Sequence, residues 1–178
     1  MVYVFLADGF EEIEALTPVD ILRRAGIDAV TVGVTGKTVT GAHGIKVESD
    51  IDIDDTVLEG LEMVVLPGGL PGADNLRANA RVRELTVCVA ENGGFVSAIC
   101  AAPRVLGELG LLKGKKAICY PGFEEYLEGA EIADKHVVRD GKVITAIGMG
   151  ASAEFALELV SAMRDKAVSD KIAEGIFA

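Results

Sequence analysis

The stretch Phe95-Val-Ser-Ala-Ile-Cys-Ala-Ala-Pro103 joins two local patterns without a spacer between them. Its first part, Phe95–Ile99, is a mainly apolar run with β-branched residues, which is typical of a strand buried on both faces. Its second part opens a helical pattern over Ala101–Leu109, where Pro103 is tolerated because a first-turn N–H has no partner to lose. A buried strand that runs directly into a helix indicates an α/β fold with a parallel sheet.

Cys100 stands at this junction, with Ala98 and Ala102 two residues to either side. This spacing matches a nucleophile elbow, in which a tight turn leaves no room for larger neighbours and pushes the thiol into the cleft. The start of the following helix is expected to favour the thiolate, which is both a nucleophile and a target of oxidation. The alternative interpretation is that Cys100 is a small core side chain, as free cysteines usually are.

The alternation of strand and helix continues along the rest of the chain. Apolar runs predict strands at Val2–Leu6, Asp28–Val34, Glu62–Leu66 and Ala117–Tyr120, and hairpins at Thr38–Glu48 and Val137–Ile147. Helical periodicity predicts helices at Glu11–Ala25, Ala73–Ala90, Ala151–Met163 and Asp165–Ile176. The expected architecture is a mainly parallel sheet covered by helices on both faces, with ligands at the carboxyl ends of its strands.

The composition favours one soluble domain over residues 1–178. Half of the residues are hydrophobic, the mean hydropathy is +0.36 and the net charge is −11. This charge disfavours nucleic acid and anionic lipid as partners, and no apolar run approaches the ~20 residues that span a bilayer. Acidic residues interrupt the N-terminus where a signal peptide needs an apolar segment, so we expect a cytoplasmic protein.

The few cysteines and histidines limit the metal and disulfide chemistry. Cysteines stand at positions 88, 100 and 119, without a C-x-x-C motif, and histidines stand only at 43 and 136. An odd cysteine count predicts no disulfide framework, and the spacing does not match a structural zinc site. Cys88 and Cys119 are expected in the core, and we predict neither a metal nor another cofactor.

Two segments that follow predicted strands carry groups that suit chemistry at Cys100. The glycines of Leu66-Pro-Gly-Gly-Leu70 can present N–H groups that, with the N–H of Ala101, bind an oxyanion, although the loop can also be a plain turn. Glu14 precedes Pro18 by four residues, so its carbonyl lacks the usual helical donor. A Glu14 carboxyl in a cleft would have a raised pKa and move protons near neutral pH. The alternative is that it only complements the helix dipole.

Together these segments resemble the ThiJ/PfpI superfamily, in order and over nearly the whole chain. The matching segments are Ala7–Glu14, Thr17–Gly26, Val64–Gly69, Ala98–Pro103 and Glu154–Leu157. The branch that the chain most resembles contains the Parkinson-disease-associated protein deglycases and the bacterial YajL-type proteins. The resemblance implies a flavodoxin-like three-layer sandwich, usually a homodimer, and a reaction without a cofactor.

The resemblance also implies roles for individual residues. Cys100 would be the elbow cysteine, and Glu14 the protonated carboxyl that is hydrogen-bonded to it. Gly69 and Ala101 would donate their N–H groups to the oxyanion.

One position departs from the pattern of many relatives. They carry a histidine just before the proline of the segment Cys119-Tyr120-Pro121, where this chain has Tyr120, so the resemblance implies no Cys–His pair. His43 falls near an arginine that in some relatives reaches the partner subunit's site, and it either lines the cleft or is a solvated hairpin residue. His136 is expected to be structural.

Three functions follow from the resemblance. The first is a cofactor-free glyoxalase or protein deglycase that acts on small 2-oxoaldehydes or on glycated proteins. The second is a redox-sensing chaperone of the oxidative stress response, in which Cys100 is oxidised to sulfinate without significant turnover. The third is a cysteine peptidase or amidase, which is disfavoured because that chemistry needs a histidine beside the cysteine.

Overall fold

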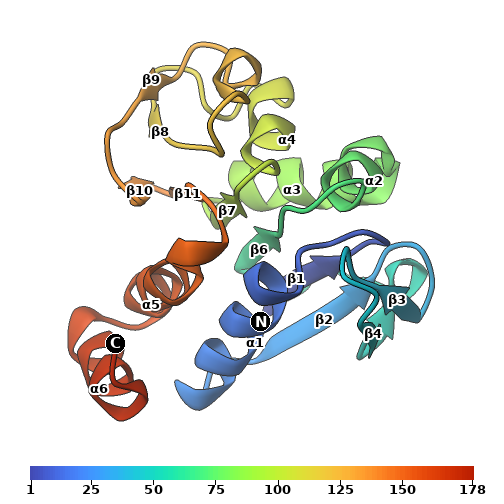
Figure 1. Cartoon of the computed structure of the whole chain (residues 1–178), viewed down its shortest axis with the longest axis horizontal. Helices are drawn as coiled ribbons and strands as arrows, with labels where there is room; N and C mark the ends of the chain where they lie inside the picture. The colour runs from blue at the N-terminus through green and yellow to red at the C-terminus, as the bar shows by residue number, and fades with distance from the viewer.

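The strand β1 (Val2–Leu6) lies inside a seven-stranded sheet, and all five of its residues are buried. The computed structural model describes residues 1–178. The sheet order is β10-β11-β7-β6-β1-β2-β5, and β10 alone runs antiparallel to its neighbour. Figure 1 shows the succession from β10 to β2. The other strands of this sheet are β2 (Ala29–Gly33), β5 (Ile51–Asp52), β6 (Met63–Leu66), β7 (Phe95–Ile99), β10 (Val137–Asp140) and β11 (Val143–Ala146).

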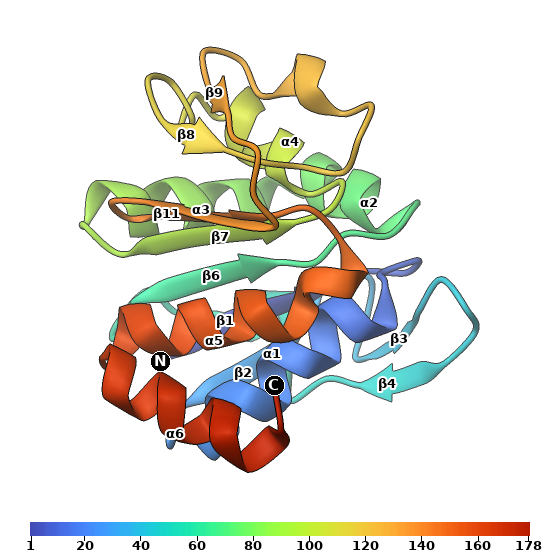
Figure 2. The same ribbon diagram turned by 60° about the vertical axis from the view of Figure 1, so that its left-hand side comes forward.

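Helices cover both faces of the sheet, as Figure 2 shows. One layer holds α1 (Glu12–Arg24), α5 (Ser152–Met163) and α6 (Lys166–Ile176), and the other holds α2 (Gly72–Ala78), α3 (Ala80–Glu91) and α4 (Pro103–Glu108). Alternating side chains of β1 separate the two cores, since Tyr3 and Phe5 pack toward α2, α3 and α4, and Val4 packs toward α1 and α5. This is the flavodoxin-like three-layer α/β sandwich that the sequence predicted.

Two small sheets lie outside the main one. The hairpin of β3 (Thr38–Thr40) and β4 (Lys46–Glu48) confirms the predicted excursion. The strand predicted at Ala117–Tyr120 is wrong, because only β8 (Lys116–Ala117) forms, paired with β9 (Glu131–Ile132). Beyond β8 the backbone is bound elsewhere: the Ile118 N–H donates to Thr145 Oγ1 at 2.9 Å, and the Tyr120 N–H donates to the Cys100 carbonyl at 2.8 Å.

The helix predicted over Ala73–Ala90 is divided into α2 and α3. Asn79 stands between them with extended backbone angles, and its side chain accepts a hydrogen bond from the Val82 N–H at 3.0 Å. An asparagine that caps the next helix ends the helical path even though the apolar period continues across it.

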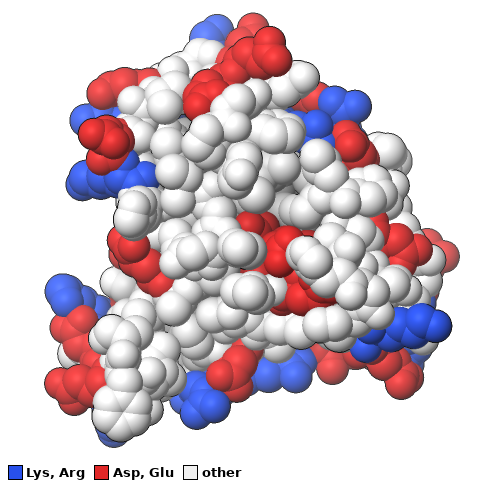
Figure 3. Space-filling model, viewed as in Figure 1, with Lys and Arg blue, Asp and Glu red and all other residues white.

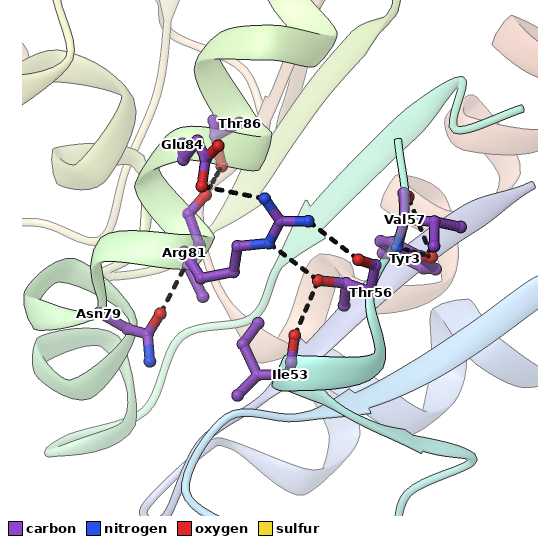
Figure 4. A network of polar contacts seen from close by, with 9 residues as sticks. Tyr3, Ile53, Thr56, Val57, Asn79, Arg81, Glu84 and Thr86 are labelled. Atoms are coloured by element: carbon purple, nitrogen blue, oxygen red, sulfur yellow. Dashed lines mark hydrogen bonds and ion pairs between the residues drawn. The ribbon is translucent and has the colours of Figure 1, made fainter. Parts of the chain in front are cut away.

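The short edge strand β5 was not predicted, and side-chain hydrogen bonds hold the segment that follows it (Figure 4). Arg81 of α3 donates to Thr56 Oγ1 at 3.1 Å and to the Thr56 carbonyl at 2.9 Å. The Tyr3 hydroxyl accepts from the Val57 N–H at 3.1 Å and donates to the Val57 carbonyl at 3.2 Å. Polar contacts of this kind leave no apolar period in the sequence.

The connections bring the ends of three strands together. The chain passes from β1 to β2 on one side of β1 and then crosses to β6 on its other side, with β7 next to β6. The carboxyl ends of β1, β6 and β7 therefore meet at the point where the strand order reverses, which is where open α/β sheets bind ligands. None of the helices is both long enough and apolar enough to cross a membrane.

Candidate active site

Cys100 lies at a sharp bend between β7 and α4. Its φ of 65° is in the left-handed region, which costs a non-glycine residue roughly 1–3 kcal/mol and is characteristic of a nucleophile elbow. Ala98 and Ala102 are fully buried on either side, and the Cys100 N–H donates to the Ala146 carbonyl at 2.9 Å. The Cys100 side chain is half-buried rather than enclosed in the core.

The carboxyl of Glu14 reaches the Cys100 sulfur from the first turn of α1. Glu14 is 1% exposed, and its side chain accepts a hydrogen bond from the backbone N–H of Gly68 at 2.9 Å. Its carboxyl lies close enough to the Cys100 side chain for each group to shift the pKa of the other. The start of α1 is docked on the same loop, since the Glu11 N–H donates to the Gly68 carbonyl at 3.0 Å.

The loop after β6 needs glycine at two successive positions. A Cβ at Gly68 would lie 2.5 Å from Glu14 Oε2 and 2.7 Å from Cys100 Cβ, so a side chain there would separate the carboxyl from the sulfur. Gly69 has a φ of 82°, and a Cβ on it would overlap the Glu11 N–H. The backbone N–H groups of Gly69 and Ala101 favour the ionised form of the Cys100 thiol and so act to lower its pKa. Two donors therefore converge where charge develops during nucleophilic attack.

Burial shifts both acids of this pair upward. Desolvation raises the pKa of Glu14 from 4.5 to about 7, against hydrogen bonds from Cys100 and Gly68 that favour the carboxylate. Desolvation, followed by the charge and hydrogen bond of Glu14, raises the pKa of Cys100 from 9.0 to about 12. Two neighbouring acids that interact this strongly titrate as a pair. At pH values between about 7 and about 12, the pair as a whole therefore holds a single proton.

The upward shift corrects the expectation that the helix end lowers the pKa of Cys100. Helix α4 begins at Pro103 and is six residues long, so Cys100 lies in the turn ahead of the helix. The sulfur is instead governed by burial and by the neighbouring carboxyl, and the N–H groups of Gly69 and Ala101 only partly offset them.

Tyr120 and His43 belong to two separate segments, one bound to Cys100 and the other to Glu12. The Tyr120 side chain is 51% exposed, and its backbone N–H is bound to the Cys100 carbonyl. His43 is in the β3–β4 hairpin, where its Nδ1 lies 2.9 Å from Glu12 Oε2 and the Glu12 contact raises its pKa. Ligand atoms of Glu11, Glu12 and His43 fall within 4.8 Å of one another, but the Glu12–His43 hydrogen bond already accounts for that arrangement.

The sequence interpretation took His136 as structural and away from the site, whereas the structure places it at an exposed surface beside Tyr120. Its side chain is exposed beside Glu154, with 3.8 Å between Nδ1 and Oε2, and the residue lines a surface hollow together with Tyr120. No local pattern links two residues that are sixteen positions apart. Cys119 is buried as expected, which raises the pKa of its thiol, whereas Cys88 is only partly buried on α3.

Charge is unevenly distributed over the surface. In the view of Figure 3, acidic side chains lie both in the middle of the face, around the start of α1, and along its periphery, whereas basic side chains lie only at the periphery.

A flavodoxin-like sandwich with a cysteine at a strand-to-helix elbow and a buried carboxyl beside it defines a class of α/β proteins. The chain belongs to the DJ-1/PfpI family, which it matches over residues 1–162. It is 35% identical to protein dj-1beta of Drosophila melanogaster over 176 residues, covering 97% of this chain and 94% of that protein.

Two other relatives bear on function and structure. A Caenorhabditis elegans protein, the glutathione-independent glyoxalase DJR-1.2, is 31% identical over 154 residues, which cover 86% of this chain and 82% of that one. The structure of oxidized Toxoplasma gondii DJ-1 superposes with a TM-score of 0.95 at 34% identity, covering 99% of this chain and 97% of that one.

Proposed function

We propose that this chain is a cofactor-free glyoxalase or protein deglycase that converts 2-oxoaldehydes, free or as protein adducts, into 2-hydroxy acids. The observation that carries the proposal is the contact between Cys100 and Glu14, with the N–H groups of Gly69 and Ala101 on the same sulfur. The glyoxalase from Caenorhabditis elegans supports it, since that relative shares most of its length with this chain.

The first step is attack by sulfur. Above pH 7 the pair holds one proton, which the two pKa values place mainly on the Cys100 sulfur. The Glu14 carboxylate accepts this proton as the sulfur attacks, and the N–H groups of Gly69 and Ala101 stabilise the thiolate that forms. The thiolate adds to the aldehyde carbon, and the carbonyl oxygen takes the proton from Glu14. The product is a hemithioacetal beside a Glu14 carboxylate.

The second step is an internal redox exchange between the two carbons of the substrate. The Glu14 carboxylate removes the proton from the hemithioacetal carbon, which gives an enediol intermediate. Glu14 then returns a proton to the neighbouring carbon. The first carbon is thereby oxidised to a thioester and the second is reduced to an alcohol. Water then cleaves the thioester, releasing the 2-hydroxy acid and the thiol, so the net change is addition of one water.

Conversion of methylglyoxal to lactate tests the proposal. The wild-type protein should form lactate without glutathione or metal, Cys100→Ser should lose this activity, and Cys88→Ser should keep it, because Cys88 lies on α3 away from the pair. Full turnover by Cys100→Ser would sink the proposal.

A second candidate function uses the same sulfur as a sensor, and the relative whose structure is described as oxidized favours it. Peroxide would convert Cys100 to sulfinate, and the proton of Glu14 would bind the product. The intact mass after peroxide treatment tests this function. The wild type should gain two oxygens at Cys100, and Glu14→Leu should not. This result supports sensing alone if the wild-type protein also turns over no aldehyde.

We also propose that two copies of the chain associate through the start of α1 and the neighbouring hairpin. Ile13 of α1 and Ile45 of the hairpin are 49% and 53% exposed, and Glu12 connects the two segments by its hydrogen bonds to His43. Large exposed apolar side chains that gather on one face mark interaction surfaces. Sedimentation should show a dimer that Ile13→Asp converts to a monomer, whereas a monomeric wild type would refute the dimer.

A further inference from the structure

A surface hollow of about 370 Å³ lies between the loop after β8 and the segment after β11. Cys100 does not line it, but Tyr120 does, and the Tyr120 backbone is bound to the Cys100 carbonyl. Tyr120 lines one side and the segment Gly148-Met149-Gly150 lines the other, with His136 at the edge. We call this the Tyr120 hollow. Only half of its lining residues are hydrophobic, but neither lysine, arginine, aspartate nor glutamate is among them.

Both walls of the Tyr120 hollow are attached to the elbow. The Tyr120 N–H donates to the Cys100 carbonyl at 2.8 Å. On the other side the Cys100 N–H donates to the Ala146 carbonyl at 2.9 Å, and the next residue, Ile147, already lines the hollow. The backbone of Cys100 is therefore bound on one side to Tyr120 of the hollow and on the other to Ala146, the residue before Ile147 of the hollow.

The two glycines of the hollow are not required by the backbone. Gly148 has a φ of 164° and a ψ of −174°, an extended conformation that any residue adopts. A Cβ on it would meet only the Tyr120 ring, at 3.4 Å from Cδ2 and 3.9 Å from Cε2, and a Cβ on Gly150 would meet nothing within 4 Å. Gly68 and Gly69 differ, because side chains there would overlap the site. At Gly148 and Gly150 the missing side chains simply leave volume open.

The size and lining of the hollow select the group that it accepts. A cavity of about 150 Å³ holds a benzene ring, so the methyl group of methylglyoxal would leave most of this space empty. Tyr120 and Met149 offer an aromatic face and a thioether, both of which pack well against another ring. The hollow has no lysine or arginine to bind an anion, His136 lies beside Glu154, and the chain carries a net charge of −11.

We propose that the Tyr120 hollow binds the carbon substituent of the 2-oxoaldehyde and favours an uncharged aromatic or apolar one. This inference rests on the proposed function, because it assigns a substrate class to the same elbow. Gly148 is then a specificity-determining position, and its lack of a side chain admits the substituent.

The test compares phenylglyoxal with methylglyoxal as substrates of wild type, Gly148→Ala and Gly148→Leu. Discrimination between small and larger apolar groups in a pocket is typically about 10- to 200-fold. The ratio of kcat/KM for phenylglyoxal to that for methylglyoxal should fall on the order of 10- to 100-fold in Gly148→Leu, with a smaller fall in Gly148→Ala. Gly175→Leu, at an exposed glycine of α6 with open space around it, is the matched control and should leave the ratio unchanged.

A binding measurement separates failure of the hollow from failure of the proposed function. Mandelate and lactate, the products of the two aldehydes, are titrated into the Cys100→Ser protein by NMR, with and without Gly148→Leu. Tighter binding of mandelate that Gly148→Leu abolishes supports the hollow as the substituent site, even if neither aldehyde is turned over and the proposed function fails. Equal losses for both aldehydes in Gly148→Leu, or equal binding of the two acids, would overturn the inference.

Discussion

Replacing Glu14 by glutamine should change how folding stability depends on pH. Burial raises the pKa of Glu14 from 4.5 to about 7 in the folded chain, and the unfolded chain releases that proton near pH 4.5. Between these values the folded state holds more protons than the unfolded state. The contribution of Glu14 to stability therefore decreases as the pH rises from 4.5 to 7, and it is level outside that window.

The magnitude follows from the difference between the two pKa values. A pKa difference between 4.5 and about 7 corresponds to about 3 kcal/mol, at roughly 1.4 kcal/mol for each pKa unit. The 1% exposure of Glu14 means that solvent does not screen this effect. Glutamine keeps an oxygen for the Gly68 N–H but has no proton to release, so wild type loses stability across the window and Glu14→Gln does not.

Urea unfolding at about pH 5 and pH 8 provides the assay. The free energy of unfolding of Glu14→Gln minus that of wild type should rise by about 2–3 kcal/mol between these two conditions. Other titrating groups cancel in this difference, and Glu91→Gln, at an exposed position of α3, controls for the loss of a charge. A difference that stays constant with pH would refute the raised pKa of Glu14.

Two further predictions concern the surroundings of the site. Gly68→Ala places a Cβ 2.5 Å from Glu14 Oε2, so it should lower aldehyde turnover about 100-fold, whereas Gly175→Ala should not, as steady-state kinetics would show. His43→Gln should destabilise the protein at about pH 6 but not at about pH 9. Glu12 raises the pKa of His43, so the stability that this pair adds is present at low pH and lost as the pH rises through that pKa. Thermal melts at both pH values check it, and equal losses would contradict it.

The sequence predicted the main sheet because its strands are uninterrupted apolar runs. Phe95–Ile99 and Val2–Leu6 form strands with the predicted bounds, and the hairpin at Val137–Ile147 forms as β10 and β11. The sequence did not reveal β5, or the early end of β8, because these features depend on where distant side chains and carbonyls accept hydrogen bonds.

The candidate site was predictable in its parts but not in its electrostatics. The small neighbours of Cys100 indicated the elbow, and Pro18 drew attention to Glu14, which the fold places against the sulfur. The pKa of Cys100 depends on burial and on a carboxyl from another segment, so local helix geometry gave the opposite sign. The approach of His136 to Tyr120 likewise arises only from tertiary packing.

The pH dependence of Cys100 alkylation tests the shared proton most directly. Iodoacetamide is added to the folded protein at a series of pH values, and peptide mass spectrometry follows the modification of Cys100. If Glu14 and Cys100 share one proton above the first pKa of the pair, the rate should rise with a midpoint near pH 7, and Glu14→Gln should move that midpoint upward. A midpoint at the ordinary thiol value of about 8.5 in both proteins, or no modification of Cys100 while the fold is intact, would contradict it.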